Sequence, residues 1–267
     1  MKRIIVTGAT GRMGSRIIAL LKEYPDLHLA GALEKKGSKD VGRDIGLLLG
    51  AGETGVQLSD DLENIIAEGD IIIDFTVPGA TMQHAKTAAE NVKAMVIGTT
   101  GFSKDEIEVL RVLSVEIPVV LAPNMSVGVN LLFKVLRDVA RVLGSDYDIE
   151  IIEAHHRMKK DAPSGTALRM AEVIADAVQR DLDEVAVYSR RGMIGERTKQ
   201  EIGIQTIRAG DIVGEHTVLF GGLGERIEIA HKVSSRDTFA RGALKAAIWI
   251  ADRRPGLYDM QDVLGLK

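Results

Sequence analysis

Hydrophobic positions in the first half of the chain alternate between short β-branched runs and longer stretches with helical spacing. The runs predict strands at residues 3–8, 27–34, 71–76, 94–100 and 118–123. The helically spaced stretches predict helices at residues 12–24, 61–68, 80–91 and 104–114. Residues 35–60 are rich in glycine and charge, so we expect mostly loop there. Strands alternating with helices predict an α/β fold, a Rossmann-like doubly wound parallel sheet with helices on both faces.

The pattern changes after residue 124. Helical spacing at residues 127–143 and 165–180 surrounds a strand at 148–154 and a polar loop at 155–163. Strand-like stretches follow near residues 185–190, 202–208, 214–220 and 226–233. Helices followed by a run of strands predict a separate α+β domain with a more open sheet. The amphipathic segment 237–251 predicts a last helix that packs back on the first domain.

Composition and charge exclude several classes of function. The chain has 267 residues, with 34 Lys and Arg against 38 Asp and Glu, and this net charge of −4 argues against binding nucleic acid through bulk positive charge. Cysteine is absent, which excludes disulfides, thiolate metal sites and a cysteine nucleophile. The apolar runs are strand-sized and the start of the chain resembles no signal peptide, so we expect a cytoplasmic protein without a membrane partner.

A glycine-rich turn lies between the first predicted strand and the first predicted helix. Gly8, Gly11 and Gly14 have the spacing G-x-x-G-x-x-G. Glycines there let the backbone approach a pyrophosphate closely, and the helix N-terminus favours its negative charge. Arg12 adds a cation. The pattern therefore predicts a dinucleotide site, although a tight structural turn is the alternative.

Glu34 completes the pattern expected of a dinucleotide site. It ends the second predicted strand, where a carboxylate can accept hydrogen bonds from the adenosine ribose. Lys35 and Lys36 follow and could hold a 2′-phosphate. NADH and NADPH therefore both fit the sequence.

Two later strand ends carry polar groups suited to a nicotinamide ribose or carboxamide. They are Gly98-Thr99-Thr100-Gly101 and Ala122-Pro123-Asn124-Met125. Ligands of open parallel sheets bind at the carboxyl ends of strands, but ordinary turn chemistry explains these residues equally well.

The segment 153–167, EAHHRMKKDAPSGTA, is a dense polar stretch in which two of the six histidines of the chain are adjacent. Ser164 is a good N-cap for the helix that follows, and Gly165 and Thr166 leave donors at its positive end. Lys159, His155 and His156 add positive charge near this helix start. The segment therefore indicates a small anionic substrate, with two carboxylates. A histidine or lysine there could donate a proton while hydride arrives.

Other interpretations of this segment deserve weight. The start at Ser164 could be a plain helix cap, and adjacent histidines on a strand face opposite sides, so at most one would face a ligand. A metal site is disfavoured by the lack of cysteine and by the poor chelating geometry of neighbouring histidines. Ser164 lacks the surrounding glycine pattern of a nucleophile elbow.

Together these segments resemble the dihydrodipicolinate reductase family, also called 4-hydroxy-tetrahydrodipicolinate reductases, of the diaminopimelate route to lysine. The matching pieces run in order over nearly the whole chain, and the segment 153–167 is the most specific. They are residues 8–14 (GATGRMG), 74–76 (DFT), 98–102 (GTTGF), 122–128 (APNMSVG), 153–167 and 231–240 (HKVSSRDTFA).

The resemblance implies a division of labour along the chain. Residues 1–126 and 236–267 would form the dinucleotide-binding domain, and residues 127–235 an inserted domain with an open mixed sheet for substrate binding and homotetramer formation. Hinges near Ser126-Val127-Gly128 and Ser234-Ser235-Arg236 would close the two over the substrate, which is reduced by NADPH or NADH without a metal.

The resemblance also implies roles for individual residues. His155 corresponds to the acid–base residue and Lys159 to the proton-donating lysine, while His156, Gly165 and Thr166 correspond to substrate-binding positions. The implied cofactor contacts are Gly8, Ala9, Thr10, Gly11, Arg12, Met13, Glu34, Lys35, Gly98, Thr99, Thr100, Ala122, Pro123, Asn124 and Met125. The residues by themselves leave open another nicotinamide-dependent dehydrogenase, or a non-catalytic sensor of NADH.

Overall fold

The computed structural model describes residues 1–267, which divide into two compact units. Residues Met1–Val127 and Arg236–Lys267 make the first unit, and Gly128–Ser235 make the second. The first unit is therefore built from two separate stretches of chain, whereas the second is continuous.

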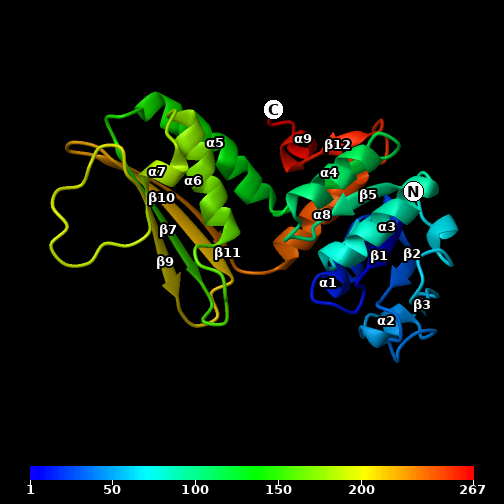
Figure 1. Ribbon diagram of the computed structural model, residues 1–267. Coiled ribbons are helices and arrows are strands. Elements are labelled where there is room, and N and C mark those ends of the chain that lie inside the picture. The colour runs from blue at the N-terminus through cyan, green and yellow to red at the C-terminus, as the bar shows by residue number, and fades with distance from the viewer. The chain divides into compact units, whose positions relative to one another are not determined.

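The first unit contains a seven-stranded sheet in the order β12-β6-β5-β4-β1-β2-β3 (Figure 1). All of its strand pairs are parallel, so the predicted doubly wound sheet is confirmed. The order reverses beside β1, which is where such sheets bind ligands. The strands are β1 (Lys2–Thr7), β2 (Leu27–Leu33), β3 (Leu58–Ser59), β4 (Ile71–Asp74), β5 (Ala94–Ile97), β6 (Pro118–Leu121) and β12 (Gly256–Tyr258).

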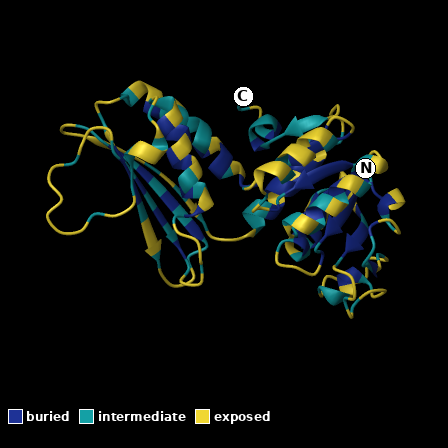
Figure 2. Ribbon diagram, viewed as in Figure 1, coloured by how far each residue is buried: buried dark blue, intermediate teal, exposed yellow.

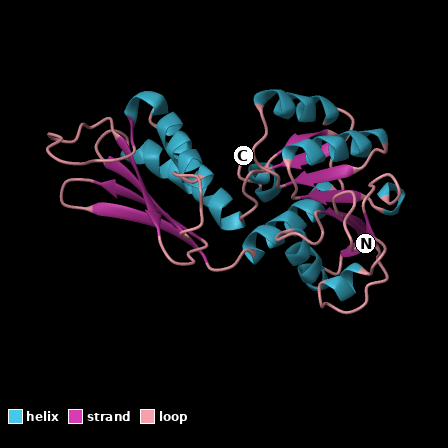
Figure 3. Cartoon of the chain, turned by 60° about the horizontal axis from the view of Figure 1, so that its bottom comes forward, coloured by secondary structure: helices cyan, strands magenta, loops and turns pink.

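Helices cover both faces of this sheet (Figure 3). Ile4 and Val6 of β1 enter one hydrophobic core, and Ile5 enters the other, because successive side chains of a strand point to opposite faces. This burial on both faces explains why the strands read as continuous apolar runs. The helices on the first face are α1 (Gly14–Leu20), α8 (Asp237–Ile250) and α9 (Met260–Leu264), and those on the second are α3 (Pro78–Glu90) and α4 (Lys104–Leu113).

The last predicted helix does pack in the first unit. Ala240, Ala243, Leu244 and Ala247 of α8 are fully buried there. A Cβ on Gly242 would lie 1.7 Å from the Met125 carbonyl oxygen, so α8 approaches the turn after β6 as closely as a glycine allows.

The sequence missed several short elements of the first unit. The predicted loop at residues 35–60 contains β3 and a single helical turn, α2 (Ile45–Leu48), capped by the Asp44 carboxylate. The helix predicted at residues 61–68 is only a 3₁₀ turn, η2 (Ile66–Glu68), and another 3₁₀ turn, η1 (Leu21–Glu23), ends the first helix. Elements this short offer too few residues for a periodic pattern.

The second unit contains a five-stranded mixed sheet in the order β11-β10-β7-β9-β8. The central strand β7 (Asp148–His155) pairs parallel with β9 (Ile202–Arg208) and antiparallel with β10 (Gly214–Gly221). The predicted open mixed sheet is confirmed. The remaining elements are β8 (Ala186–Val187), β11 (Arg226–Val233), α5 (Val127–Leu143), α6 (Gly165–Ala177) and α7 (Leu182–Val185).

Helices cover one face of this second sheet (Figures 1 and 3). Ile149 and Ile151 of β7 are buried in a core with Leu136 of α5 and Ile174 of α6. The alternate residues of β7 are only partly buried (Figure 2), and Ile207 of β9 is 47% exposed. The opposite face of the sheet is thus uncovered by helices (Figures 1 and 3).

Candidate functional site

The glycine turn after β1 has the close packing that its spacing predicts. Gly8 has a φ of +60°, in the left-handed region that favours glycine. A Cβ on Gly14 would lie 2.2 Å from the Gly8 carbonyl oxygen, and a Cβ on Gly11 would lie 3.0 Å from the same atom. Side chains at these two positions would fill the turn. The turn therefore fits the backbone cradle that a pyrophosphate requires.

Glu34 lies against this turn. Its Oε2 accepts hydrogen bonds from the Thr10 hydroxyl at 2.5 Å and the Thr10 amide at 3.3 Å, and its Oε1 accepts one from the Lys35 amide at 3.1 Å. The Arg12 and Lys35 side chains are exposed beside it. The structure thus brings together the two halves of the predicted dinucleotide pattern, with cations near them.

The turns after β4 and β5 adjoin the glycine turn. A Cβ on Gly8 would lie 3.2 Å from the methyl group of Thr76, and a Cβ on Gly98 would lie 2.1 Å from the ring of Phe75. Glycine at position 98 therefore lets the Phe75 ring pack over the end of β5. The carboxyl ends of β1, β4 and β5 form one continuous edge.

A buried carboxylate that sequence reasoning missed organises this edge. Asp74 is fully buried and accepts hydrogen bonds from the hydroxyls of Thr76, Thr81 and Thr99 at 2.7–3.0 Å, while its Oδ2 lies 2.6 Å from His84 Nδ1. Burial raises the pKa of Asp74, but the hydrogen bonds, led by that of His84, outweigh it and lower the pKa. An aspartate ending an apolar strand was the available signal.

The predicted nicotinamide contacts occupy different environments. The Thr99 hydroxyl donates to Asp74 and accepts from the Thr76 amide, so this side chain stabilises the edge of the sheet. Thr100, in contrast, is exposed. In the turn after β6, Ala122 and Met125 are buried and Pro123 is exposed. The Asn124 side chain accepts a hydrogen bond from the Ser126 amide at 2.9 Å, as in an ordinary turn.

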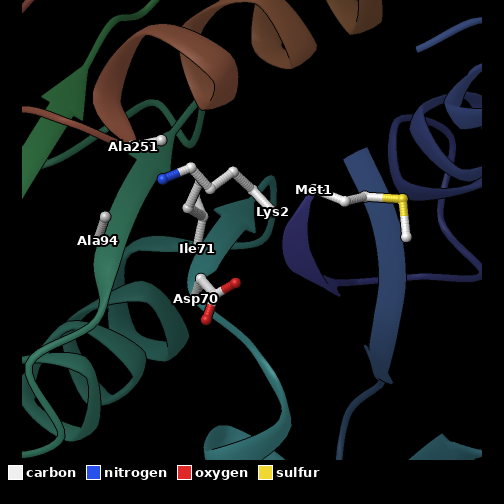
Figure 4. Close-up of a pocket in the computed structure, with 6 residues that line it drawn as sticks. All are labelled: Met1, Lys2, Asp70, Ile71, Ala94 and Ala251. Atoms are coloured by element: carbon white, nitrogen blue, oxygen red, sulfur yellow. The ribbon is translucent and has the colours of Figure 1, made fainter. Parts of the chain in front are cut away.

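The first unit also has a shallow hollow at the opposite edge of its sheet (Figure 4). It measures about 450 Å³ and lies at the amino-terminal ends of β1, β4 and β5. Because ligands of such sheets bind at the carboxyl ends of strands, this hollow lies away from the predicted dinucleotide site. The residues that line it are Met1, Lys2, Asp70, Ile71, Ala94 and Ala251.

In the second unit, a buried carboxylate lies at the centre of the histidine-rich segment. Glu153 of β7 has no exposed surface. Its Oε2 lies 2.6 Å from His155 Nδ1 and 2.8 Å from Arg208 Nη1. Its Oε1 accepts from Arg208 Nη2 at 2.8 Å, from the Ser164 amide at 3.0 Å and from the Thr206 hydroxyl at 3.3 Å.

Sequence reasoning gave Glu153 no role, and it missed Arg208 and His216. The available signal was a glutamate on the side of β7 that otherwise buries Ile149 and Ile151. A charged residue is rarely placed in such a position without partners. Two of its partners, Thr206 and Arg208, lie on β9, too far along the chain for spacing to reveal them.

Burial also lowers the pKa values of the two histidines in this cluster. His155 and His216 are 8% and 4% exposed, and their ring centroids lie 5.2 Å apart. Burial lowers the pKa of His155, against the opposing effect of the Glu153 carboxylate. Burial, with His155 nearby, lowers the pKa of His216 to about 4. Both rings are therefore neutral at pH 7.

The polar loop after β7 is held at several points. Lys159 Nζ lies 2.9 Å from Asp161 Oδ1. The His156 amide donates to the Ile212 carbonyl at 2.7 Å, and the Lys159 amide donates to the His156 carbonyl at 3.1 Å. His156 and Lys159 are partly buried, so their side chains remain partly accessible.

The start of α6 confirms the predicted cap. The Ser164 hydroxyl accepts from the Ala167 amide at 3.2 Å and lies 3.0 Å from His216 Nε2. Gly165 is exposed, and a Cβ built on it would meet nothing within 4 Å. Thr166 is partly buried. The exposed first turn of α6 thus lies beside the buried Glu153 and His216.

The chain contains neither a metal-binding cluster nor a membrane-spanning helix. No group of three or more His, Cys, Asp or Glu side chains has an arrangement that could hold a metal ion. None of the helices is both long and apolar enough to cross a membrane.

A parallel Rossmann-like sheet joined to a second mixed-sheet unit defines a class of folds that includes solved dehydrogenases. An amine dehydrogenase from Mycobacterium smegmatis aligns over 96% of this chain and 94% of its own with a TM-score of 0.57, and at 16% identity this likeness shows the fold alone. Within that class the chain belongs to the dihydrodipicolinate reductase family. It matches the models for the family's N-terminus over residues 2–125 and C-terminus over residues 128–264.

Individual relatives agree with this membership over the full length. The chain is 58% identical to the 4-hydroxy-tetrahydrodipicolinate reductase of Syntrophus aciditrophicus (strain SB) and 56% identical to that of Geotalea uraniireducens (strain Rf4), each over 100% of both chains. A dipicolinate-bound dihydrodipicolinate reductase from Paenisporosarcina sp. TG-14 superposes with a TM-score of 0.76 at 25% identity, over 98% of each chain.

Proposed function

We propose that this chain reduces 4-hydroxy-tetrahydrodipicolinate with a reduced nicotinamide nucleotide, and that His155 and Lys159 supply the proton. The reductase activity and its place in lysine biosynthesis are those of the family to which the chain belongs. The observation that carries this proposal is the similarity to reductases at 56–58% identity, unbroken over 267 residues.

The first unit is the proposed nucleotide domain. The turn from Gly8 to Met13 would hold the pyrophosphate, Glu34 the ribose, and the segments 98–100 and 122–125 the nicotinamide end. A bound reduced nicotinamide supplies the hydride for the reaction. Lys35 is exposed beside Glu34 and can neutralise a 2′-phosphate, although it lacks the planar fork of arginine. We propose that both NADPH and NADH are accepted, in the cytoplasm.

The second unit is the proposed substrate domain. A relative was solved with dipicolinate, a ring with two carboxylates. We propose that His156, Gly165 and Thr166 bind a carboxylate of the substrate, since the exposed start of α6 offers backbone donors and a favourable dipole. The reaction replaces a C4–OH bond by a C4–H bond. A proton from His155 or Lys159 then leaves with the hydroxyl as water.

The test of these roles is a pair of variants, His155→Ala and Lys159→Ala. Each should lower kcat by about 100-fold or more, because general acid catalysis contributes that much. Binding of NADPH, measured by its fluorescence, should persist, since the residues that would hold it lie in the other unit. The assay follows NADPH and NADH oxidation with freshly generated substrate. Lys160→Ala is the matched control, because this neighbouring lysine is exposed. Normal kcat in both test variants would remove the assigned roles.

We also propose that the uncovered face of the second sheet mediates a homotetramer. Ile152 of β7, Ile207 of β9 and Leu219 of β10 alternate with residues of the covered face, and no helix of the chain packs over them. Ile207→Glu should reduce the mass measured by light scattering below that of four chains. Val142→Glu, at an 84% exposed position of α5, should leave the mass unchanged.

A further inference from the structure

We propose that Glu153 is a positioning residue that fixes the tautomer of His155, with Nδ1 carrying a permanent proton and Nε2 left as the atom that exchanges protons. The proposal rests on the acid–base role proposed above for His155. Glu153 itself would touch neither substrate nor cofactor.

Strand register brings this cluster together. Glu153 and His155 are two residues apart on β7, so their side chains share one face of the sheet. Thr206 and Arg208 lie opposite them on β9, and His216 lies opposite Glu153 on β10. The carboxylate is thereby surrounded on both sides by side chains that can donate hydrogen bonds.

The tautomer follows from counting donors. An ionised carboxylate can only accept hydrogen bonds, so every polar atom that approaches it must donate. The two oxygens of Glu153 have five such neighbours: two nitrogens of Arg208, the Ser164 amide, the Thr206 hydroxyl and His155 Nδ1. At 2.6 Å, Nδ1 must therefore carry a proton. A neutral His155 then has an unprotonated Nε2, and this atom must take up a proton before the ring can donate one to the substrate.

The carboxylate stays ionised over the working range of the enzyme. Burial alone raises the pKa of Glu153, but hydrogen bonds from Arg208 and His155 lower it to about 2. The other charged or titratable groups that act on His155 are Lys159 and Arg208, which disfavour its protonation. His216, the remaining ring beside His155, is neutral at pH 7, with its pKa lowered to about 4.

Glycine at position 214 leaves space beside the second ring nitrogen of His155, Nε2. A Cβ on Gly214 of β10 would lie 3.1 Å from His155 Nε2, which is closer than side chains normally approach. A side chain at this position would crowd Nε2, whereas Nδ1 is hydrogen-bonded to the Glu153 carboxylate. The two ring nitrogens are thus treated differently, as a group that shuttles protons through one atom requires.

The same carboxylate also anchors the proposed substrate site. Its Oε1 binds the Ser164 amide at the start of α6, eleven residues further along the chain. Stability alone does not explain such an arrangement, because a buried ion pair replaced by apolar groups of similar shape is often neutral or stabilising. Glu153 instead sets the position of the anion-binding helix relative to the imidazole.

The first test is the tautomer of His155 in the wild-type enzyme. The ¹⁵N chemical shifts of histidine-labelled protein, assigned by comparison with His155→Gln, should show a protonated Nδ1 and an unprotonated Nε2 at pH 8. A wild-type spectrum with the proton on Nε2 instead would overturn the proposal without any variant having to fold.

The second test is Glu153→Gln. Gln keeps one accepting oxygen and carries an NH₂ donor in place of the other. With the oxygen toward the Ser164 amide, the NH₂ group faces His155 Nδ1, which favours the His155 tautomer with an unprotonated Nδ1. We expect the ¹⁵N signature to switch and kcat to fall on the order of 100-fold or more, with NADPH affinity unchanged. Glu153→Asp keeps the charge and should recover part of kcat together with the wild-type tautomer.

The matched control is Glu150→Gln on the same strand. Glu150 is also paired with arginines, Arg190 and Arg197, but it does not contact His155. Its substitution should leave the tautomer and kcat unchanged. An unchanged His155 tautomer in folded Glu153→Gln, or an equal loss of kcat in Glu150→Gln, would contradict the positioning role. The acid–base role of His155 would be removed by a normal kcat in His155→Ala. If Glu153→Gln still switched the tautomer of His155, the positioning of the ring by Glu153 would stand.

Discussion

His216 shows how one buried side chain makes stability depend on pH. Its Nε2 lies 3.0 Å from the Ser164 hydroxyl, and burial lowers its pKa from 6.5 to about 4. Below pH 6.5 the unfolded chain takes up a proton that the folded chain refuses until about pH 4. The folded state is therefore destabilised as the pH falls through this window, by on the order of 3 kcal/mol.

His216→Asn should remove this part of the pH dependence. Between pH 6.5 and 4 the free energy of unfolding of the variant should fall less steeply than that of the wild type, by up to one proton's slope. Urea unfolding at a series of pH values measures it. His28→Asn, at an exposed position, is the control and should keep the wild-type slope. Equal slopes in the His216 variant and the wild type would contradict the shift.

At the residue scale, the sequence predicted the groups whose residue type and spacing are typical of a known kind of site. Gly8, Gly14 and Glu34 lie together as their pattern predicts. The proximity of Glu153 to His216 could not be found in this way, because the two become neighbours only through the pairing of β7 with β10. The catalytic roles assigned to His155 and Lys159 stay predictions, as do the substrate-binding roles assigned to His156, Gly165 and Thr166.

At the scale of elements, the glycine turn depends on the closest packing in the first unit. Gly14→Ala would place a Cβ 2.2 Å from the Gly8 carbonyl oxygen, so the turn or α1 must shift. We expect a loss of stability of about 1–3 kcal/mol, since overpacking costs that much, together with weaker NADPH binding. Thermal unfolding and a fluorescence titration measure the two effects.

Gly79→Ala provides the matched control for this prediction. Gly79 lies in the first turn of α3, and a Cβ there would meet nothing within 4 Å. This substitution should leave cofactor binding unchanged and stabilise the protein by up to about 1 kcal/mol, because alanine favours the helix. A Gly14 variant that binds NADPH as tightly as the Gly79 variant would show that the turn tolerates a side chain.

Long, strongly periodic elements were predicted best. The bounds of α5, Val127–Leu143, agree with the sequence pattern, whereas the predicted strands at 71–76 and 94–100 end earlier, at Asp74 and Ile97. The residues after these ends leave the sheet to form the polar edge, where side-chain hydrogen bonds replace strand pairing. The short strand β12 carries no apolar pattern of its own, so only its pairing with β6 defines it.

At the scale of the whole molecule, the two units have separate hydrophobic cores. The core of the second unit draws only on residues within 128–235. We expect a fragment of residues 128–235 to fold alone and to unfold cooperatively, as followed by circular dichroism. A fragment without a cooperative transition would show that this core is insufficient.

The first unit should not fold without the end of the chain. A fragment of residues 1–127 lacks α8, α9 and β12, which complete one core and one edge of its sheet. We expect it to be unfolded or aggregated. The matched control joins residues 1–127 to residues 236–267 through a flexible glycine-serine linker, which should restore a cooperative transition. A stable 1–127 fragment would contradict the importance of α8.

The interrupted first unit has a consequence for biosynthesis. A ribosome synthesises residues 236–267 only after the whole of the intervening stretch 128–235. The first unit therefore keeps part of its apolar core exposed while residues 128–235 are synthesised and pack. Chaperones that recognise exposed apolar segments would meet this enzyme through its N-terminal half during translation.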